Sequence, residues 1–206
     1  MKSVYLLFVL MFLTLSQSCL KEADETILVH DPQKIPFITD GRWPRELLRL
    51  FGEENVNFGD LPPRLECEFK SNHQYVATNL PVGLSPAIGS TTPVIHYHRF
   101  SNQYLQICEY HSMNSAENVR HVVDTAYITG HDNKFTAYFL EIWSTPGTPT
   151  LAVIISGEVA DEGVVNYRYG YQIVDYADEA VPANVYPLNS VFVFQDPDHL
   201  SEYTPW

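Results

Sequence analysis

Histidine side chains recur at an interval of two residues in one part of this chain. His96 and His98 are separated by one residue, so in an extended strand both imidazoles lie on one face, about 6 to 7 Å apart. Such a pair can supply two ligands to zinc, and a third could come from His73, His111 or His121 after folding. Two histidines without a third ligand at fixed local spacing are more often polar strand residues, some buried and hydrogen-bonded. His96 and His98 are therefore weak metal candidates, and we predict no metal or other cofactor.

Three tyrosines follow the same spacing in the segment Val164 to Tyr176. A row of flat, amphipathic rings suits stacking on the faces of sugars or lining a pocket with hydroxyl donors. More often, rings in such a row pair with neighbouring strands in a core or at a sheet edge. We take the three tyrosines as the candidate ligand-binding residues. The face they share comprises Val165, Tyr167, Tyr169, Tyr171 and Ile173.

The sequence motifs of hydrolytic enzymes identify no candidate catalytic residue. Neither Gly-x-Ser-x-Gly nor His-Glu-x-x-His occurs in the sequence. Glycoside hydrolysis needs only two carboxylates at the right separation, which depends on the fold. The sequence therefore favours a protein that is not an enzyme, without excluding one. Asp196-Pro197-Asp198 lacks the alternating ligands and the glycine of a calcium loop and predicts a terminal turn.

The chain begins with the pattern of a bacterial export signal. Lys2 precedes an apolar run from Val4 to Leu15, and the small residues Ser16 and Ser18 follow. The run is about 12 residues long, too short for a bilayer core of ~30 Å at a helical rise of 1.5 Å per residue. We expect residues 1–18 to be a signal peptide.

Cys19 follows directly after that cleavage position. The segment Leu13 to Cys19 resembles the lipobox of bacterial lipoproteins, and Lys21-Glu22-Ala23-Asp24-Glu25 resembles the tract that follows the lipidated cysteine in surface lipoproteins of the Bacteroidota. The resemblance implies a lipid anchor on Cys19 and display on the outer face of the outer membrane. Ser16 stands where a lipobox usually has leucine, and ordinary signal peptidase, the alternative, would cut at the same bond.

A second resemblance lies far downstream of the anchor. The run Ile154 to Glu158, with Glu162-Gly163 and the tyrosine-rich segment after it, is similar to uncharacterised β-rich lipoproteins of the same phylum. It implies no function for any residue.

The amino-acid composition excludes some classes of binding partner. The formal net charge of −13 argues against binding to nucleic acid or to anionic headgroups, since both repel an acidic surface. A hydrophobic content of 45%, with 13 tyrosines and 11 phenylalanines, is typical of a folded domain. Cys67 and Cys108 remain beside Cys19, and they form either one disulfide or two separate buried thiols.

Periodicity predicts one helix followed by strands. After an anchor and tether at 19–40, the segment Arg42 to Gly52 predicts a short helix, with Pro44 in its first turn and Gly52 as its stop. Beyond Pro63 the period changes from 3.6 to 2. Pro81 to Pro93 predicts a long loop. The expected strands are Leu65–Lys70, Gln74–Leu80, Val94–Phe100, Gln103–Tyr110, Val119–Ile128, Lys134–Trp143, Thr150–Val159, Val164–Tyr176 and Leu188–Gln195.

Short connections between these strands predict a single all-β domain over 41–206, an antiparallel meander of about eight or nine strands. We favour a lipocalin-like β-barrel because Val153 and Ile155 alternate with Ala152 and Ile154, so that both strand faces are apolar. A β-sandwich with a covered outer face is the alternative.

The predicted function is that of a cell-envelope lipoprotein acting as a ligand-binding or interaction module for a small lipophilic molecule or a glycan. One alternative is a glycan or ester hydrolase. Another is a structural subunit of a surface complex, which a broad exposed apolar patch would reveal. The oligomeric state is left open.

Overall fold

The structure is a computed structural model that describes residues 44–116, 120–142, 148–176 and 186–205. The expected signal peptide, Cys19 and the tether at 19–40 lie outside the described residues. Within the described ranges, no helix is both long enough and apolar enough to cross a membrane. The elements are the helices α3 (Arg45–Phe51) and η2 (Glu53–Asn55) and the strands β1 (Cys67–Thr78), β2 (Thr91–Tyr104), β3 (Ile107–Asn114), β4 (Arg120–His131), β5 (Lys134–Ile142), β6 (Pro149–Val159), β7 (Gly163–Tyr176), β8 (Val191–Gln195) and β9 (Leu200–Glu202).

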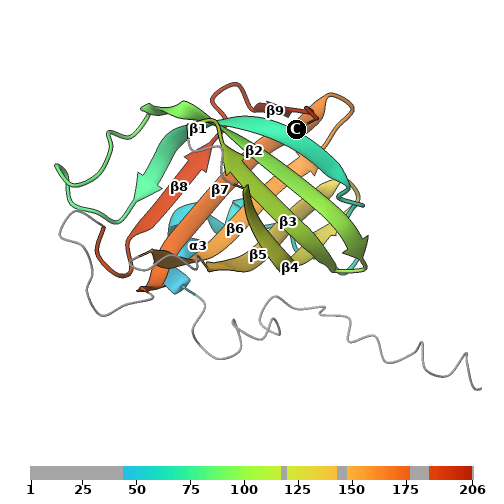
Figure 1. The fold of residues 1–206 in the computed structure, drawn as a ribbon, viewed down its shortest axis with the longest axis horizontal. Helices are drawn as coiled ribbons and strands as arrows, with labels where there is room; N and C mark the ends of the chain where they lie inside the picture. Colours follow the sequence, from blue (N-terminus) through green and yellow to red (C-terminus); the bar gives the residue numbers. More distant parts are fainter. Residues whose placement is uncertain (1–43, 117–119, 143–147, 177–185, 206) are drawn as a thin grey trace, which may run out of the picture.

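The strands form one antiparallel sheet that closes on itself. Its order is β6-β5-β4-β3-β2-β1-β8-β7-β9, and β6 also pairs with β7. From β1 to β8, therefore, each strand pairs with the next one in the chain, and the β1–β8 pairing completes the ring (Figure 1). The all-β meander is confirmed, and a single closed sheet fits the favoured barrel arrangement rather than the two packed sheets of a sandwich.

Two short strands share one position in the ring. β8 lies between β1 and β7, whereas β9 pairs with the start of β7 and reaches β1 through a bridge between Tyr203 and Phe69. Asp196 joins the parts across the intervening turn: its Oδ2 accepts hydrogen bonds from the Asn72 backbone N–H (3.1 Å) and the Ser201 hydroxyl (3.0 Å). The Asp196 carboxylate therefore has a structural role, at the terminal turn that the sequence predicts.

Helix α3 covers the outer face of the ring. Gly52 follows it with φ of 89°, in the left-handed region that favours glycine, so the predicted helix and its stop are confirmed. The helix begins at Arg45, so Pro44 precedes it instead of lying in its first turn, and Arg42 lies outside the described residues. Leu47 and Phe51 are fully buried against outward-facing side chains of β5, β6 and β8. Gly170 lies beneath them: a Cβ there would be 2.9 Å from Phe51 Cδ2. A glycine on β7 thus allows the helix to pack closely.

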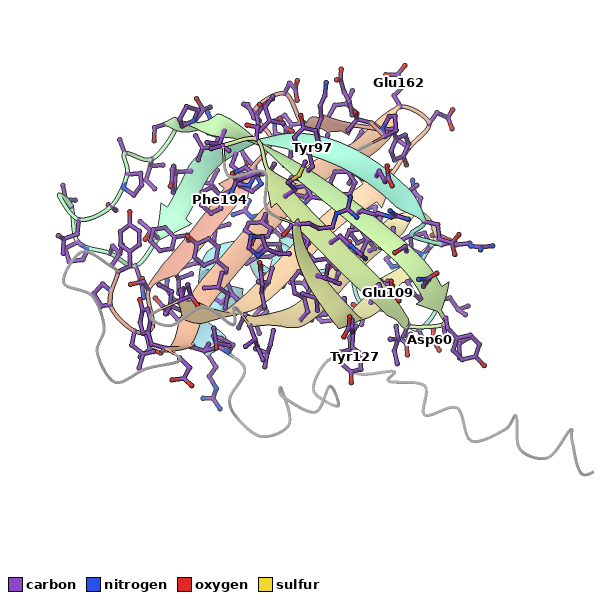
Figure 2. The ribbon with its side chains drawn as sticks, in the orientation of Figure 1. Asp60, Tyr97, Glu109, Tyr127, Glu162 and Phe194 are labelled. Carbon is purple, nitrogen blue, oxygen red and sulfur yellow. The ribbon has the colours of Figure 1, made fainter. Side chains whose placement is uncertain are left out.

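The helix explains why strands of this sheet are apolar on both faces. Val153 and Ile155 point into the ring, and Ala152 and Ile154 point outward to the layer beneath α3. Figure 2 shows side chains in the space that the strands enclose, whereas Glu162, at the turn between β6 and β7, projects away from it.

The structure corrects several predicted strands. The two strands expected at 65–70 and 74–80 are one continuous strand, β1, and the chain turns between β2 and β3 at Leu105, which has φ of 54°. β9 was not predicted. Asn166, with φ of 53°, lies at an irregularity in the β6–β7 register, so Val164 enters the core in place of the predicted Val165.

Candidate functional site

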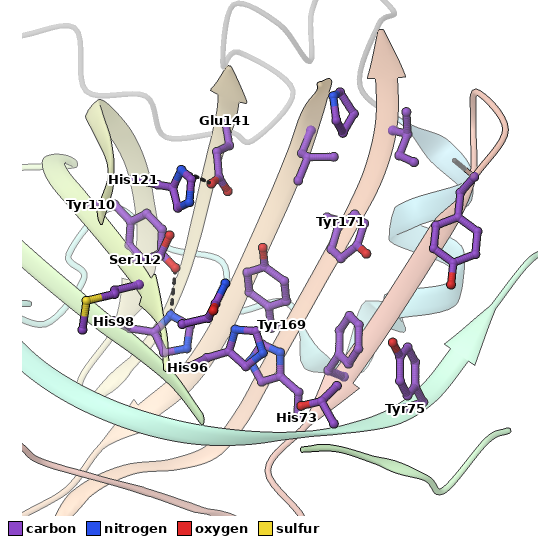
Figure 3. Close-up of a pocket in the computed structure, with 18 of the residues that line it drawn as sticks. His73, Tyr75, His96, His98, Tyr110, Ser112, His121, Glu141, Tyr169 and Tyr171 are labelled. Atoms are coloured by element: carbon purple, nitrogen blue, oxygen red, sulfur yellow. Dashed lines mark hydrogen bonds and ion pairs between the residues drawn. The ribbon is translucent and has the colours of Figure 1, made fainter. Parts of the chain in front are cut away.

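A cavity of about 490 Å³ occupies one end of the ring. It lies at the end where β1, β3, β5 and β7 finish, and its lining comes from all eight strands of the closed ring (Figure 3). The opposite end is filled by apolar side chains, among them Leu65, Phe69, Phe100 and Phe135. The ring is therefore packed at one end and hollow at the other.

His98 forms the floor of the cavity and is hydrogen-bonded at both ring nitrogens. Its Nδ1 lies 2.8 Å from the Tyr110 hydroxyl, and its Nε2 lies 2.9 Å from the Ser71 hydroxyl and 3.1 Å from the Tyr167 hydroxyl. A neutral imidazole has one donor and one acceptor nitrogen, and hydroxyls can meet either. His98 is thus the buried, hydrogen-bonded polar strand residue that was one interpretation of the His96 and His98 pair.

His73 and His96 stack beside this floor. Their ring centroids are 3.8 Å apart and their planes differ by 6°. Burial, and then the charges of His96 and His98, lower the pKa of His73 well below its usual 6.5. Burial, and then His96, likewise lower the pKa of His98. His73 and His98 are consequently neutral at neutral pH, and they offer the cavity flat, polar and uncharged surfaces.

The predicted tyrosine row faces the interior. Tyr169 and Tyr171 line the cavity, whereas Tyr167 lies at its base, 1% exposed, with its ring edge against Phe69. Burial raises the pKa of Tyr167 and Tyr169 well above 10, so their hydroxyls stay protonated. The three residues therefore lie together, two on the cavity wall and one beneath it.

Glu141 brings a carboxylate to the cavity wall. It is 5% exposed and lies on β5, with Oε1 3.9 Å from Nδ1 of His121 on β4. That distance is too long for a hydrogen bond, so the two groups are charged or polar neighbours. Figure 3 shows both directed toward the space that Tyr169 and Tyr171 also face.

The histidines predicted as possible metal ligands are only partly brought together. His73 and His121 line the same cavity as His96 and His98, but His111 lies on the other face of β3 from Tyr110, 3.6 Å from Glu109. Over the described residues, no three histidine, cysteine, aspartate or glutamate side chains are placed to hold one metal ion. Instead, His73 and His96 contact each other through their ring faces.

Sequence reasoning did not select Glu141, although a signal for it exists. In the strand predicted at Lys134 to Trp143, Phe135, Ala137 and Phe139 alternate inward, and Glu141 continues the same register. An acid at an inward position of an otherwise apolar row marks either a functional group or an error in the assigned register. The structure shows that the register holds.

The rim of the cavity end carries exposed apolar side chains. The connection from β1 to β2 exposes Val82, Leu84 and Ile88, and no charged residue occurs from Asn79 to Ile95. This connection starts where β1 finishes, at the end of the ring where the cavity lies. This end of the ring therefore carries exposed apolar surface on the connection from β1 to β2.

Searches with this chain against protein-family models, curated proteins and solved structures find no match. The geometry of the cavity therefore carries the functional argument.

Proposed function

We propose that this chain is an exported envelope lipoprotein whose closed sheet binds a small, flat and largely apolar organic molecule in its cavity. The observation that carries the proposal is the cavity of about 490 Å³ at one end of the ring. Pockets for small ligands usually measure about 300 to 1,000 Å³ and are mostly apolar and aromatic, with a few polar groups that fix orientation.

The lining favours a flat ligand. Tyr169, Tyr171 and Phe194 present rings to the cavity, and the stacked pair of His73 and His96 adds a further planar surface. Aromatic rings pack well against other flat groups, in offset or edge-to-face contact. Hydroxyl and imidazole groups among these rings can hydrogen-bond to a polar edge of the ligand.

Two other functions fit the site less well. A hydrolase of glycosides needs two carboxylates, and among the described residues that line the cavity Glu141 is the one acid. A glycan-binding surface would need the tyrosine row on the outside of the sheet, but Tyr169 and Tyr171 face inward. Binding of a small molecule inside the ring remains the function that this geometry supports best.

The test is a titration with N-phenyl-1-naphthylamine, a neutral aromatic probe whose fluorescence rises in apolar surroundings. Ser112 lines the cavity, so Ser112→Phe fills part of it, whereas Val122→Phe adds the same ring at an exposed position, 52% accessible, on the outer face of β4. We expect saturable binding to the native protein and to Val122→Phe, and at least about tenfold weaker binding to Ser112→Phe. No saturable binding to the native protein, or equal binding to the two variants, would refute the proposal.

The anchor is tested separately. Lipidated Cys19 would carry acyl chains that each contribute ~0.8 kcal/mol per buried methylene, enough to hold the protein on a membrane. We expect the native precursor expressed in a bacterium to incorporate labelled fatty acid and to partition into the detergent phase, and Cys19→Ala to do neither. Equal partitioning of the two forms would favour ordinary secretion.

A further inference from the structure

The described lining of the cavity includes one acidic side chain. Glu141 is buried in the wall, and the described residues that line the cavity include neither lysine nor arginine. His121 lies beside it, with Nδ1 3.9 Å from Oε1 of the carboxylate. A ligand in this cavity would therefore meet the carboxylate of Glu141.

The influence of this carboxylate extends across the cavity. Burial is the first cause of the raised pKa values of Tyr110, Tyr169 and Tyr171, and the charge of Glu141 adds to the rise at all three. These hydroxyls belong to β3 and β7, on either side of β5 in the ring. Inside a closed sheet such interactions are screened by salt much less than at the surface.

The tyrosine rings of the cavity would also attract a positively charged group. Tyrosine faces carry negative electrostatic potential and attract cations within about 6 Å of their centres. Tyr169 and Tyr171 lie 6.0 Å apart between centroids, at an interplanar angle of 60°, so they present two differently oriented surfaces to one space. Aromatic surfaces recur in the recognition of ammonium groups, and a carboxylate attracts the same charge.

We infer that the cavity selects organic cations: it binds a small aromatic amine, with the ammonium group beside Glu141 and the flat part against Tyr169 and Tyr171. This inference rests on the proposed function and names the ligand class. The same lining opposes the carboxylate of a fatty acid or an aromatic acid, which would be placed beside the like charge of Glu141.

Three ligands that share one ring system provide the test. They are 1-naphthylmethylamine, 1-naphthalenemethanol and 1-naphthaleneacetate, which at neutral pH are cationic, neutral and anionic. Each is used to displace N-phenyl-1-naphthylamine from the purified protein. We expect the amine to bind at least about tenfold more tightly than the acetate, with the alcohol between them.

Matched variants assign the preference to one side chain. Glu141→Gln keeps the shape and removes the charge, so it should lower the affinity for the amine about tenfold and leave that for the alcohol unchanged. Glu109→Gln removes the same charge from β3 outside the cavity, where the Glu109 side chain is 38% exposed, and should change neither affinity.

The outcomes separate this inference from the proposed function. If the alcohol binds and the amine is no tighter than the acetate, the charge selectivity is refuted and the cavity remains a binding site. If neither N-phenyl-1-naphthylamine nor any of the three ligands binds, the proposed function itself fails. The comparison of the ligands on native protein decides the matter even if Glu141→Gln does not fold.

Discussion

The imidazole rings of His73 and His96 lie face to face, 3.8 Å apart between centroids and 6° from parallel, in the interior of a closed sheet. Two protonated rings at this distance would repel each other strongly, because their charges would be close together and His73 is buried. The stack is compatible with the fold only while at least one ring is neutral. Histidines, which ordinarily titrate near neutral pH, thus lie where their protonated forms are unfavourable.

The first prediction is that mild acid destabilises the protein. Burial foremost lowers the pKa values of His73 and His98 below the 6.5 of an unfolded chain. Below about pH 6.5 the unfolded chain therefore binds more protons than the folded one. Stability is full above that pH and falls as pH decreases, by at most about 1.4 kcal/mol per pH unit for each histidine.

Asp196 acts in the opposite direction. Burial, together with Asp198, raises its pKa from 3.8 to about 6. Between these values the folded state holds the proton more tightly, so this group adds stability as pH falls and offsets part of the histidine effect. The net loss on acidification should still be clear, since two histidines oppose one carboxyl.

Urea unfolding at about pH 7.5 and about pH 5.5 measures this loss. His73→Phe keeps a flat ring on His96 and removes one of the two histidine titrations, so it should reduce the net pH dependence by more than half, because the opposing contribution of Asp196 remains. His199→Asn, at an exposed position with a positive φ that asparagine tolerates, serves as the control and should leave it unchanged. An unaltered pH dependence in His73→Phe would contradict the assignment.

The second prediction concerns Tyr110 and Tyr167, whose hydroxyls hydrogen-bond with His98. Tyr110→Phe removes the hydroxyl at Nδ1, 2.8 Å away, and leaves a buried ring nitrogen without that partner. Tyr167→Phe removes one of two hydroxyls at Nε2, where Ser71 remains at 2.9 Å. We expect Tyr110→Phe to cost about 1 to 3 kcal/mol and Tyr167→Phe less than about 1 kcal/mol.

Chemical unfolding of both variants at neutral pH checks this order. Tyr104→Phe provides the matched control. The Tyr104 side chain is 71% exposed, so removing its hydroxyl should leave the free energy of unfolding nearly unchanged. Equal losses in the two variants would mean either that the hydroxyl of Ser71 does not satisfy Nε2 of His98 or that the contact of the Tyr167 hydroxyl with Nε2 of His73, 3.4 Å away, also stabilises the fold.

Local patterns in the sequence were sufficient for much of this fold. Gly52 ends the helix, and alternation placed Tyr167, Tyr169 and Tyr171 on one inward face. Ring closure is different, because it depends on pairs such as Gln74 with Gln195, which are far apart in the chain. Apolar residues on both strand faces favoured a barrel but also allowed a sandwich, so only the pairing decides between them.

The site was predictable only in part. His96 and His98 share a face by simple alternation, but their contacts with His73 and Tyr110 come from neighbouring strands whose register the sequence does not state. Glu141 could have been recognised as an acid in an apolar row. The irregularity at Asn166, which turns Val164 inward in place of Val165, has no comparable local signal.

The third prediction is that both domain cysteines are unreactive thiols in the folded protein. Cys67 and Cys108 are free, which decides between the two possibilities left open by the sequence. Burial foremost raises the pKa of each to about 12, so at about pH 8 only about one thiol in 10⁴ is ionised. Ellman's reagent should label neither in folded Cys19→Ala protein and two per chain in concentrated guanidinium. No labelling after unfolding would indicate a disulfide.

The last prediction tests the packing of α3 on the outside of the ring. Phe51→Ala removes a fully buried ring and should cost about 3 to 5 kcal/mol, whereas Arg49→Ala on the solvent side should have little effect. Gly170→Ala should also destabilise, because its Cβ would lie 2.9 Å from Phe51 Cδ2 and 3.1 Å from Leu47 Cδ1. In the Phe51→Ala background that Cβ occupies vacated space, so the two losses should combine to less than their sum.

Unfolding in urea gives the four free energies of this cycle. Additive losses would mean that Gly170 is not held under Phe51. Because α3 lies outside the ring and the cavity lies inside, folded Gly170→Ala protein should bind N-phenyl-1-naphthylamine with native affinity. A weakened affinity would show that the outer helix shapes the cavity through β7, which carries both Gly170 on its outer face and Tyr169 and Tyr171 on its inner one.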